Sequence, residues 1–73
     1  MNLAAHWGPR IREARLARGM RQEELAAAIG VTQPTISDWE AGRWAPRDAV
    51  RPALAAALGV PVAELFAYPA VAS

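Results

Sequence analysis

The chain has 73 residues and a formal net charge of +1, which describes one small domain without a strong electrostatic bias. A chain this short buries only roughly 60% of the surface of its unfolded form, so its core is small. It has no cysteine and one histidine, His6, which excludes disulfides, thiol nucleophiles and a zinc ligand set, and we expect no cofactor.

The longest apolar stretches are rich in alanine and interrupted by arginine, glycine and proline. None approaches the roughly 18–20 residues that a membrane span needs. Residues 1–8 also lack the charged start and long apolar core of a secretory signal. We therefore expect a soluble, cytoplasmic protein.

The first predicted helix begins at Gly8-Pro9, because proline is well tolerated in a first helical turn. Ile11, Ala14 and Leu16 supply its apolar side, and Gly19 ends it. The next predicted helix covers 22–29 and is ended by Gly30.

Val31 begins a tight turn, after which Thr32 is placed to cap a third helix over 33–41. Ile36 and Trp39 face inward at a spacing of three, and Gly42 stops this helix. A loop, Gly42–Pro46, follows.

A fourth helix lies within 47–58 and is regular mainly from Arg51 or Pro52 onward, with Gly59 as its stop. A short fifth helix, over 62–66, closes the core with Leu65 and Phe66. The prediction is an all-α, five-helix single domain, ordered over about residues 7–66, with a flexible tail over 67–73.

The second and third predicted helices are short and meet at a fixed turn, which is the unit that proteins place in the DNA major groove. Ala26 is small, so the two helices can cross closely. Gln22 and Gln33 open the two helices, where an amide can reach a phosphate or an adenine edge.

The run ELAAAIGVTQPTISDWEAG, followed later by LAAALGV, resembles the phage-repressor and Cro-type (XRE-type) helix-turn-helix family over about residues 7–66. The matching positions include Gln22, Leu25-Ala26, Gly30-Val31, Gln33, Ile36, Trp39-Glu40, Gly42, Pro46 and 58–60. The resemblance implies a compact five-helix, lambda-repressor-like domain. It further implies a two-fold dimer that binds double-stranded DNA at a palindromic operator, with the third helix in the major groove.

The resemblance also assigns roles to residues. Gln33 reads a base edge, Gln22 holds a phosphate, and Arg15 with Glu40 forms a structural pair between the first and third helices. The residues expected to contact DNA are Arg21, Gln22, Thr32, Gln33, Pro34, Thr35, Ser37, Asp38, Arg43 and Trp44.

Four positions depart from the family pattern. Arg21 stands where a capping hydroxyl or amide is common, and Pro61 replaces a capping hydroxyl before the last helix. Asp38 can accept from cytosine N4 but is repelled by phosphates. Trp44 is unusual in its loop, and packing over the loop, contact with a second subunit and contact with a sugar–phosphate are all open to it.

Catalysis finds no support in the chain, because no base or oxyanion device accompanies Ser37 and Asp38. The expected function is a sequence-specific transcriptional regulator that represses as a dimer. The alternative is a protein-interaction module of the same fold that binds another polypeptide, such as an antitoxin that binds its toxin or an adaptor inside a larger assembly. Asp38, Trp44 and the small net charge favour that alternative.

Overall fold

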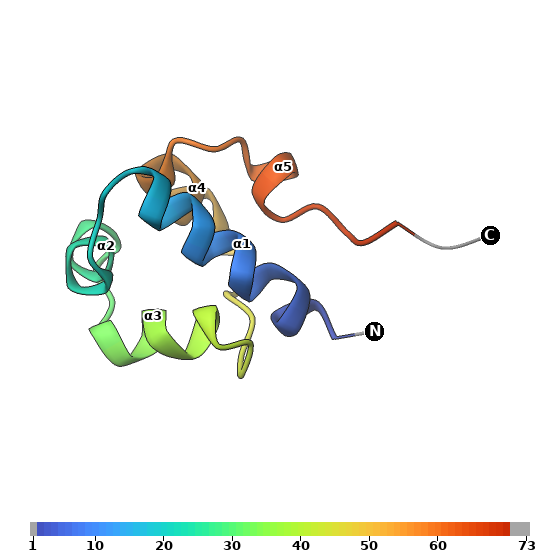
Figure 1. Cartoon of the computed structure of the whole chain (residues 1–73), viewed down its shortest axis with the longest axis horizontal. Coiled ribbons are helices and arrows are strands. Elements are labelled where there is room, and N and C mark those ends of the chain that lie inside the picture. The colour runs from blue at the N-terminus through green and yellow to red at the C-terminus, as the bar shows by residue number, and fades with distance from the viewer. Residues whose placement is uncertain (1, 71–73) are drawn as a thin grey trace.

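Residues 2–70, the part of the chain that this computed structural model describes, form five α-helices and no β-strand (Figure 1). The helices are α1 (Leu3–Ala17), α2 (Gln22–Ile29), α3 (Gln33–Glu40), α4 (Arg51–Leu58) and α5 (Val62–Leu65). The all-α, five-helix prediction is therefore confirmed. None of the helices within 2–70 is long and apolar enough to cross a membrane.

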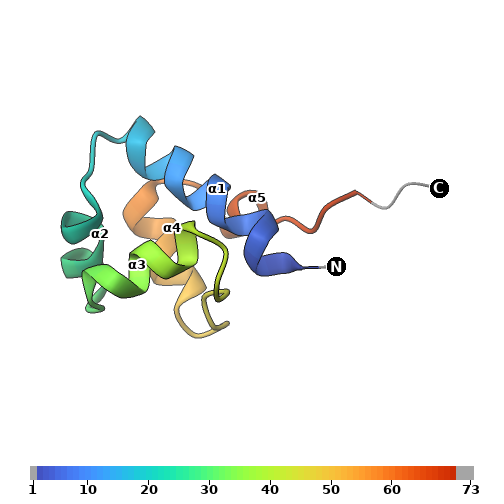
Figure 2. The same cartoon turned by 60° about the horizontal axis from the view of Figure 1, so that its bottom comes forward.

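Helix α3 packs against both α1 and α2, while α4 packs against α2 and α5. In Figure 2, α3 and the loop that follows it lie below α1, with α4 behind α3. Between the helices lies one hydrophobic core, which consists of Trp7, Ile11, Leu25, Ala26, Ile36, Trp39, Leu54, Ala55, Leu58, Leu65 and Phe66.

Two glycines end helices where the sequence predicted. Gly30 has φ +74° and Gly59 has φ +69°, in the left-handed region that glycine enters without steric cost. The predicted bounds of α2 are confirmed, and α4 begins at Arg51 as expected. Helix α3 stops at Glu40, one residue earlier than predicted, and Ala41 is its C-cap.

The predicted start of the first helix was wrong, because α1 begins at Leu3 and Pro9 lies inside it. Asn2 caps this helix by accepting a hydrogen bond from the backbone N–H of Ala5 at 3.2 Å. The extra turn carries Trp7 into the core, where its ring meets Phe66 edge-on at 5.2 Å. Burial of a large aromatic ring offsets the roughly 3 kcal/mol that a proline costs inside a helix.

Gly8 has no side chain, so the backbone of α1 can lie close to the backbone at the end of α3. A Cβ atom there would lie 2.6 Å from the carbonyl oxygen of Trp39 and 2.7 Å from that of Glu40. Both obstacles are backbone atoms, so the glycine at this position serves helix packing rather than the start of a helix.

Leu16 was predicted on the inner side of the first helix, but its side chain is 54% exposed. Successive residues of an α-helix are rotated by about 100°, so Leu16 points roughly 140° away from the buried Ile11. Arg15, about one turn after Ile11, lies on nearly the same side of the helix and is buried. The buried side of α1 therefore includes a charged residue in place of the leucine.

Part of the expected tail contacts the core. The indole N–H of Trp7 donates to the carbonyl oxygen of Ala67 at 2.9 Å, and the ring of Tyr68 packs edge-on against Trp7 at 5.8 Å. Residues 71–73 of that expected tail lie outside the described residues.

Candidate functional site

The turn between α2 and α3 is short and held by backbone hydrogen bonds. The N–H of Val31, just after Gly30, donates to the carbonyl oxygen of Ala26 at 3.0 Å and closes the end of α2. Helix α3 begins two residues later, at Gln33. Ala26 is buried at the crossing of the two helices, as its small size predicted.

Thr32 occupies the N-cap position of α3, but its expected capping hydrogen bond is not formed. Its hydroxyl oxygen instead lies 3.0 Å from that of Thr35. Pro34 follows in the first turn of the helix, where its missing N–H costs nothing. The start of α3 therefore relies on proline and on the hydroxyl pair rather than on a side-chain cap.

Helix α3 has one buried side and one open side. Ile36, Trp39 and Glu40 are buried, which confirms Trp39 as a core residue. The residues expected to face DNA lie on the open side: Gln33 and Pro34 are exposed, and Ser37 and Asp38 are half-buried. These four positions form a stripe along the outside of the helix.

The first residues of α2 and α3 are hydrogen-bonded to each other. Gln33 Nε2 donates to Gln22 Oε1 at 2.6 Å, and Gln22 Nε2 donates to Glu40 Oε1 at 3.1 Å. A carboxylate only accepts hydrogen bonds, so Glu40 fixes which end of the Gln22 amide faces Gln33. The sequence predicts both glutamines at helix starts, but the contact between them depends on how α2 and α3 cross.

Glu40 is also the partner of Arg15, as the resemblance implied. Arg15 Nε donates to Glu40 Oε2 at 2.6 Å and Arg15 Nη2 to Glu40 Oε1 at 2.9 Å, with side-chain exposures of 9% and 4%. The hydrogen bond from Arg15 to the Glu40 carboxylate raises the pKa of the Arg15 guanidinium above its usual value. A buried two-point ion pair thus lies directly behind Gln22 and Gln33.

Arg21 precedes α2 and remains exposed. Its backbone N–H donates to Glu24 Oε1 at 2.8 Å, and this bond lowers the pKa of the Glu24 carboxyl. The contact therefore stabilises the helix start above the pKa of an unfolded glutamate and is lost as pH falls through the lowered value. The guanidinium of Arg21 remains at the surface, next to the start of α2.

Arg43 follows the end of α3 and forms an ion pair with Asp38 on the open stripe. The distance from Arg43 Nη1 to Asp38 Oδ1 is 2.9 Å. The sequence does not predict this pair, because a spacing of five residues does not mark two side chains as partners once the helix has ended. The structure brings them together through the turn at Gly42, which has φ +77°.

Trp44 extends from the loop between α3 and α4, and its side chain is 67% exposed. Of the three interpretations open to it, packing over its own loop is wrong. The loop itself is anchored, because Pro46 is fully buried and its carbonyl oxygen accepts from Arg51 Nε at 3.0 Å.

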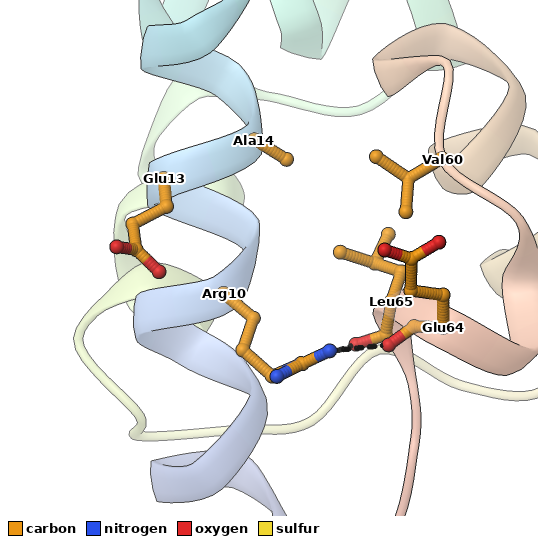
Figure 3. Close-up of a pocket in the computed structure, with 6 residues that line it drawn as sticks. All are labelled: Arg10, Glu13, Ala14, Val60, Glu64 and Leu65. Carbon is orange, nitrogen blue, oxygen red and sulfur yellow. Dashed lines mark hydrogen bonds between the residues drawn. The ribbon is translucent and has the colours of Figure 1, made fainter.

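From the sequence alone, Arg10 and Arg51 are predicted to be solvated, but both make structural contacts. Arg10 donates to the carbonyl oxygens of Glu64 and Leu65 at the end of α5 (Figure 3). The guanidinium carbon of Arg51 lies 4.5 Å from the ring centre of Trp7 and pairs with Asp48. The contacts of Arg10 with α5 and of Arg51 with Trp7 join residues of separate elements, so helical periodicity does not predict them. The pair of Arg51 with Asp48 is local, since the two residues are three apart.

The hollow beside Arg10 is a poor candidate for a ligand site. It has a volume of about 180 Å³, and its lining residues are Arg10, Glu13, Ala14, Val60, Glu64 and Leu65. Ligand pockets usually exceed about 300 Å³. The open stripe of α3, with the start of α2, is therefore the candidate site.

Comparison with known proteins agrees with this geometry. The family model described as Helix-turn-helix matches residues 11–65. The chain is 47% identical over 49 residues to an uncharacterized HTH-type transcriptional regulator of Methanothermobacter thermautotrophicus, a match that covers 67% of this chain and 71% of the relative. It is 41% identical over 56 residues to the cryptic phage CTXphi transcriptional repressor RstR of Vibrio cholerae, covering 77% of this chain and 50% of that repressor.

Two solved structures share the fold. The restriction-modification controller protein C.AhdI from Aeromonas hydrophila superposes with a TM-score of 0.80 at 33% identity, covering 86% of this chain and 91% of the controller. The hypothetical transcription factor NHTF from Neisseria superposes with a TM-score of 0.82 at 34% identity, covering 92% of this chain and 77% of that protein. These relatives are named as regulators of transcription or of restriction-modification, not as enzymes.

Proposed function

Because the chain belongs to the helix-turn-helix family, we propose that this DNA-binding regulator is a repressor that binds a palindromic operator as a two-fold dimer. The observation that carries the proposal is the pair of linked glutamines, Gln22 and Gln33, at the open ends of α2 and α3. A repressor acts where the DNA is, so we place it in the cytoplasm.

In this proposal, α3 lies in the major groove with its open stripe toward the bases. Gln22 accepts one N–H of the Gln33 amide. The other N–H and the amide oxygen remain for adenine, whose N7 accepts and whose N6 amino group donates. Pro34, Ser37 and Asp38 complete the side that faces the groove.

The DNA backbone is held by groups around the motif. Gln22, Arg21 and Arg43 are the proposed phosphate contacts, and the hydroxyls of Thr32 and Thr35 lie beside the start of α3. Such contacts position the protein without reading sequence. Each neutralised phosphate also releases counterions, which makes the affinity depend on salt.

The salt dependence of binding tests the proposal. We expect the duplex just upstream of the protein's own gene to be shifted in a mobility assay at 50 mM salt. If a dimer makes about six phosphate contacts, affinity falls roughly a thousandfold between 50 and 200 mM salt. A random duplex of equal length is the control for sequence preference.

The alternative, a protein-binding domain such as an antitoxin or adaptor, is favoured by the acidic Asp38 and the exposed Trp44. It predicts no salt-dependent shift of either duplex. A folded protein that leaves both duplexes unshifted at low salt would contradict DNA binding and support this second function.

The dimer is a separate prediction. One α3 helix reads only a few base pairs, so we expect two subunits per duplex, on half-sites about 34–36 Å apart. The dimer surface predicted from the sequence is the last helix, with Val62, Leu65, Phe66 and the apolar tail. Leu65 and Phe66 are buried in the subunit itself, while Val62 and Tyr68 are exposed, so only part of this apolar area is free to pair. Sedimentation that finds one subunit on each duplex at saturating protein would contradict the dimer.

We propose that Trp44 lies against the sugar–phosphate backbone next to Arg43. Among the three tryptophans Trp44 alone is exposed, since Trp7 and Trp39 are buried, so quenching of fluorescence by acrylamide reports on Trp44. We expect operator DNA to reduce this quenching. The control is Trp44→Phe, which removes the fluorescence that acrylamide can quench but keeps the fluorescence of the buried Trp7 and Trp39. Unchanged quenching in a saturated complex would exclude the contact.

A further inference from the structure

The ion pair between Asp38 and Arg43 joins a residue of the groove-facing stripe to a residue proposed to hold a phosphate. Besides the 2.9 Å side-chain contact, the backbone N–H of Arg43 donates to the carbonyl oxygen of Asp38 at 3.0 Å. Gly42, in the turn between them, packs closely against α1, since a Cβ atom there would lie 2.9 Å from the Cα of Ala5. The two side chains thus lie next to each other in the structure without DNA.

The two partners have opposite preferences at a DNA surface. The Arg43 side chain is 65% exposed and its guanidinium is attracted to phosphate, whereas the Asp38 side chain is 35% exposed and its carboxylate is repelled. As long as the Asp38 carboxylate holds Arg43, the pair is neutral and displaces no counterions from the DNA phosphates. An exposed ion pair is weak, so a modest competing interaction is enough to open it.

Resting on the proposed function, we propose that Asp38 makes the phosphate contact of Arg43 conditional on the base in the groove. Where the facing base presents an amino group, as cytosine N4 and adenine N6 do, the carboxylate accepts from it and Arg43 transfers to a phosphate. Where the base presents only acceptors, as guanine O6 and N7 do, the carboxylate remains on Arg43. Asp38 is thus a specificity-determining residue that weakens binding to wrong sequences.

The test is Asp38→Asn, which keeps an acceptor oxygen but removes the charge that holds Arg43. On a random duplex we expect affinity at low salt to rise several-fold and the slope of log affinity against log salt to steepen by about 0.9 for each subunit bound. On the operator the gain is smaller, so the ratio of operator to random affinity falls by up to several-fold.

A matched control separates this effect from net charge. Asp48 also pairs with an arginine, Arg51, but it lies in the loop before α4 and its side chain is 91% exposed. Asp48→Asn changes the charge equally and should leave both the salt slope and the affinity ratio as in the wild type. Thermal unfolding of each variant confirms that the domain is folded.

The Arg43→Gln background decides the mechanism. If Asp38 acts by holding Arg43, adding Asp38→Asn to Arg43→Gln no longer steepens the salt slope on random DNA. An equal steepening in both backgrounds would mean simple repulsion of phosphates and would overturn the proposal.

The same experiments distinguish failure of this inference from failure of the proposed function. If the wild type binds its operator with salt dependence but Asp38→Asn changes neither the salt slope nor the affinity ratio, the inference alone fails. If the wild type shows no salt-dependent binding, the proposed function fails.

Discussion

Glu40→Ala is expected to lower the free energy of unfolding by about 3 kcal/mol, because it leaves the buried Arg15 charge without its partner. Gln22 also loses the acceptor that orients its amide. A domain of 73 residues has a total stability of only about 4–11 kcal/mol, so this loss is a large fraction. Thermal unfolding should show a midpoint lower by roughly 10–20 °C.

The control for this prediction is Glu13→Ala, which removes an exposed glutamate from α1. A surface change of this kind usually alters stability by less than about 0.5 kcal/mol. If Glu40→Ala were no less stable than Glu13→Ala, the buried pair would not be holding α1 to the end of α3.

Gln33→Ala is expected to weaken binding to the operator by about 1–3 kcal/mol and to leave binding to random DNA nearly unchanged, because a bidentate contact to adenine exists only at the right base. Gln33 is exposed, so its loss should not unfold the domain. Affinities for operator and random duplexes, measured at one salt concentration, check the prediction.

Arg21→Ala provides the contrast. Its guanidinium is exposed beside the start of α2 and is proposed to meet a phosphate. Its loss should weaken binding to operator and random DNA alike and reduce the slope of log affinity against log salt by about one per subunit. If Gln33→Ala shows the same uniform loss, Gln33 contacts the backbone rather than a base.

Some of the fold could be predicted because the signals are local. Helix α2 and the end of α4 are bounded by Gly30 and Gly59, whose left-handed backbone conformation is one that other residues rarely adopt. The spacing of Ile36 and Trp39 identified the buried side of α3 in the same way. The resemblance added Arg15 and Glu40, which neither periodicity nor composition would have joined.

The start of α1 could not be predicted, because it depends on distant parts of the chain. The local rule for Gly8-Pro9 is a helix start, yet burial of Trp7 against Phe66 and Ala67 extends the helix upstream through the proline. Gly8 is needed because a side chain there would clash with carbonyl groups at the end of α3, which lie about thirty residues later in the sequence. A local propensity is a weak preference that packing of a large aromatic side chain readily overrides.

The sequence by itself therefore determined the helical fold, the helix-turn-helix and the side chains on the open face of α3, since these depend on periodicity, glycine conformation and registered motif positions. Only the tertiary structure decided how these side chains pair: Gln33 with Gln22, Gln22 with Glu40, and Asp38 with Arg43. Each of these contacts depends on how two helices cross or how a loop returns. The hydrogen-bonding groups are present in the sequence, but the distances between them are fixed only when the core is packed.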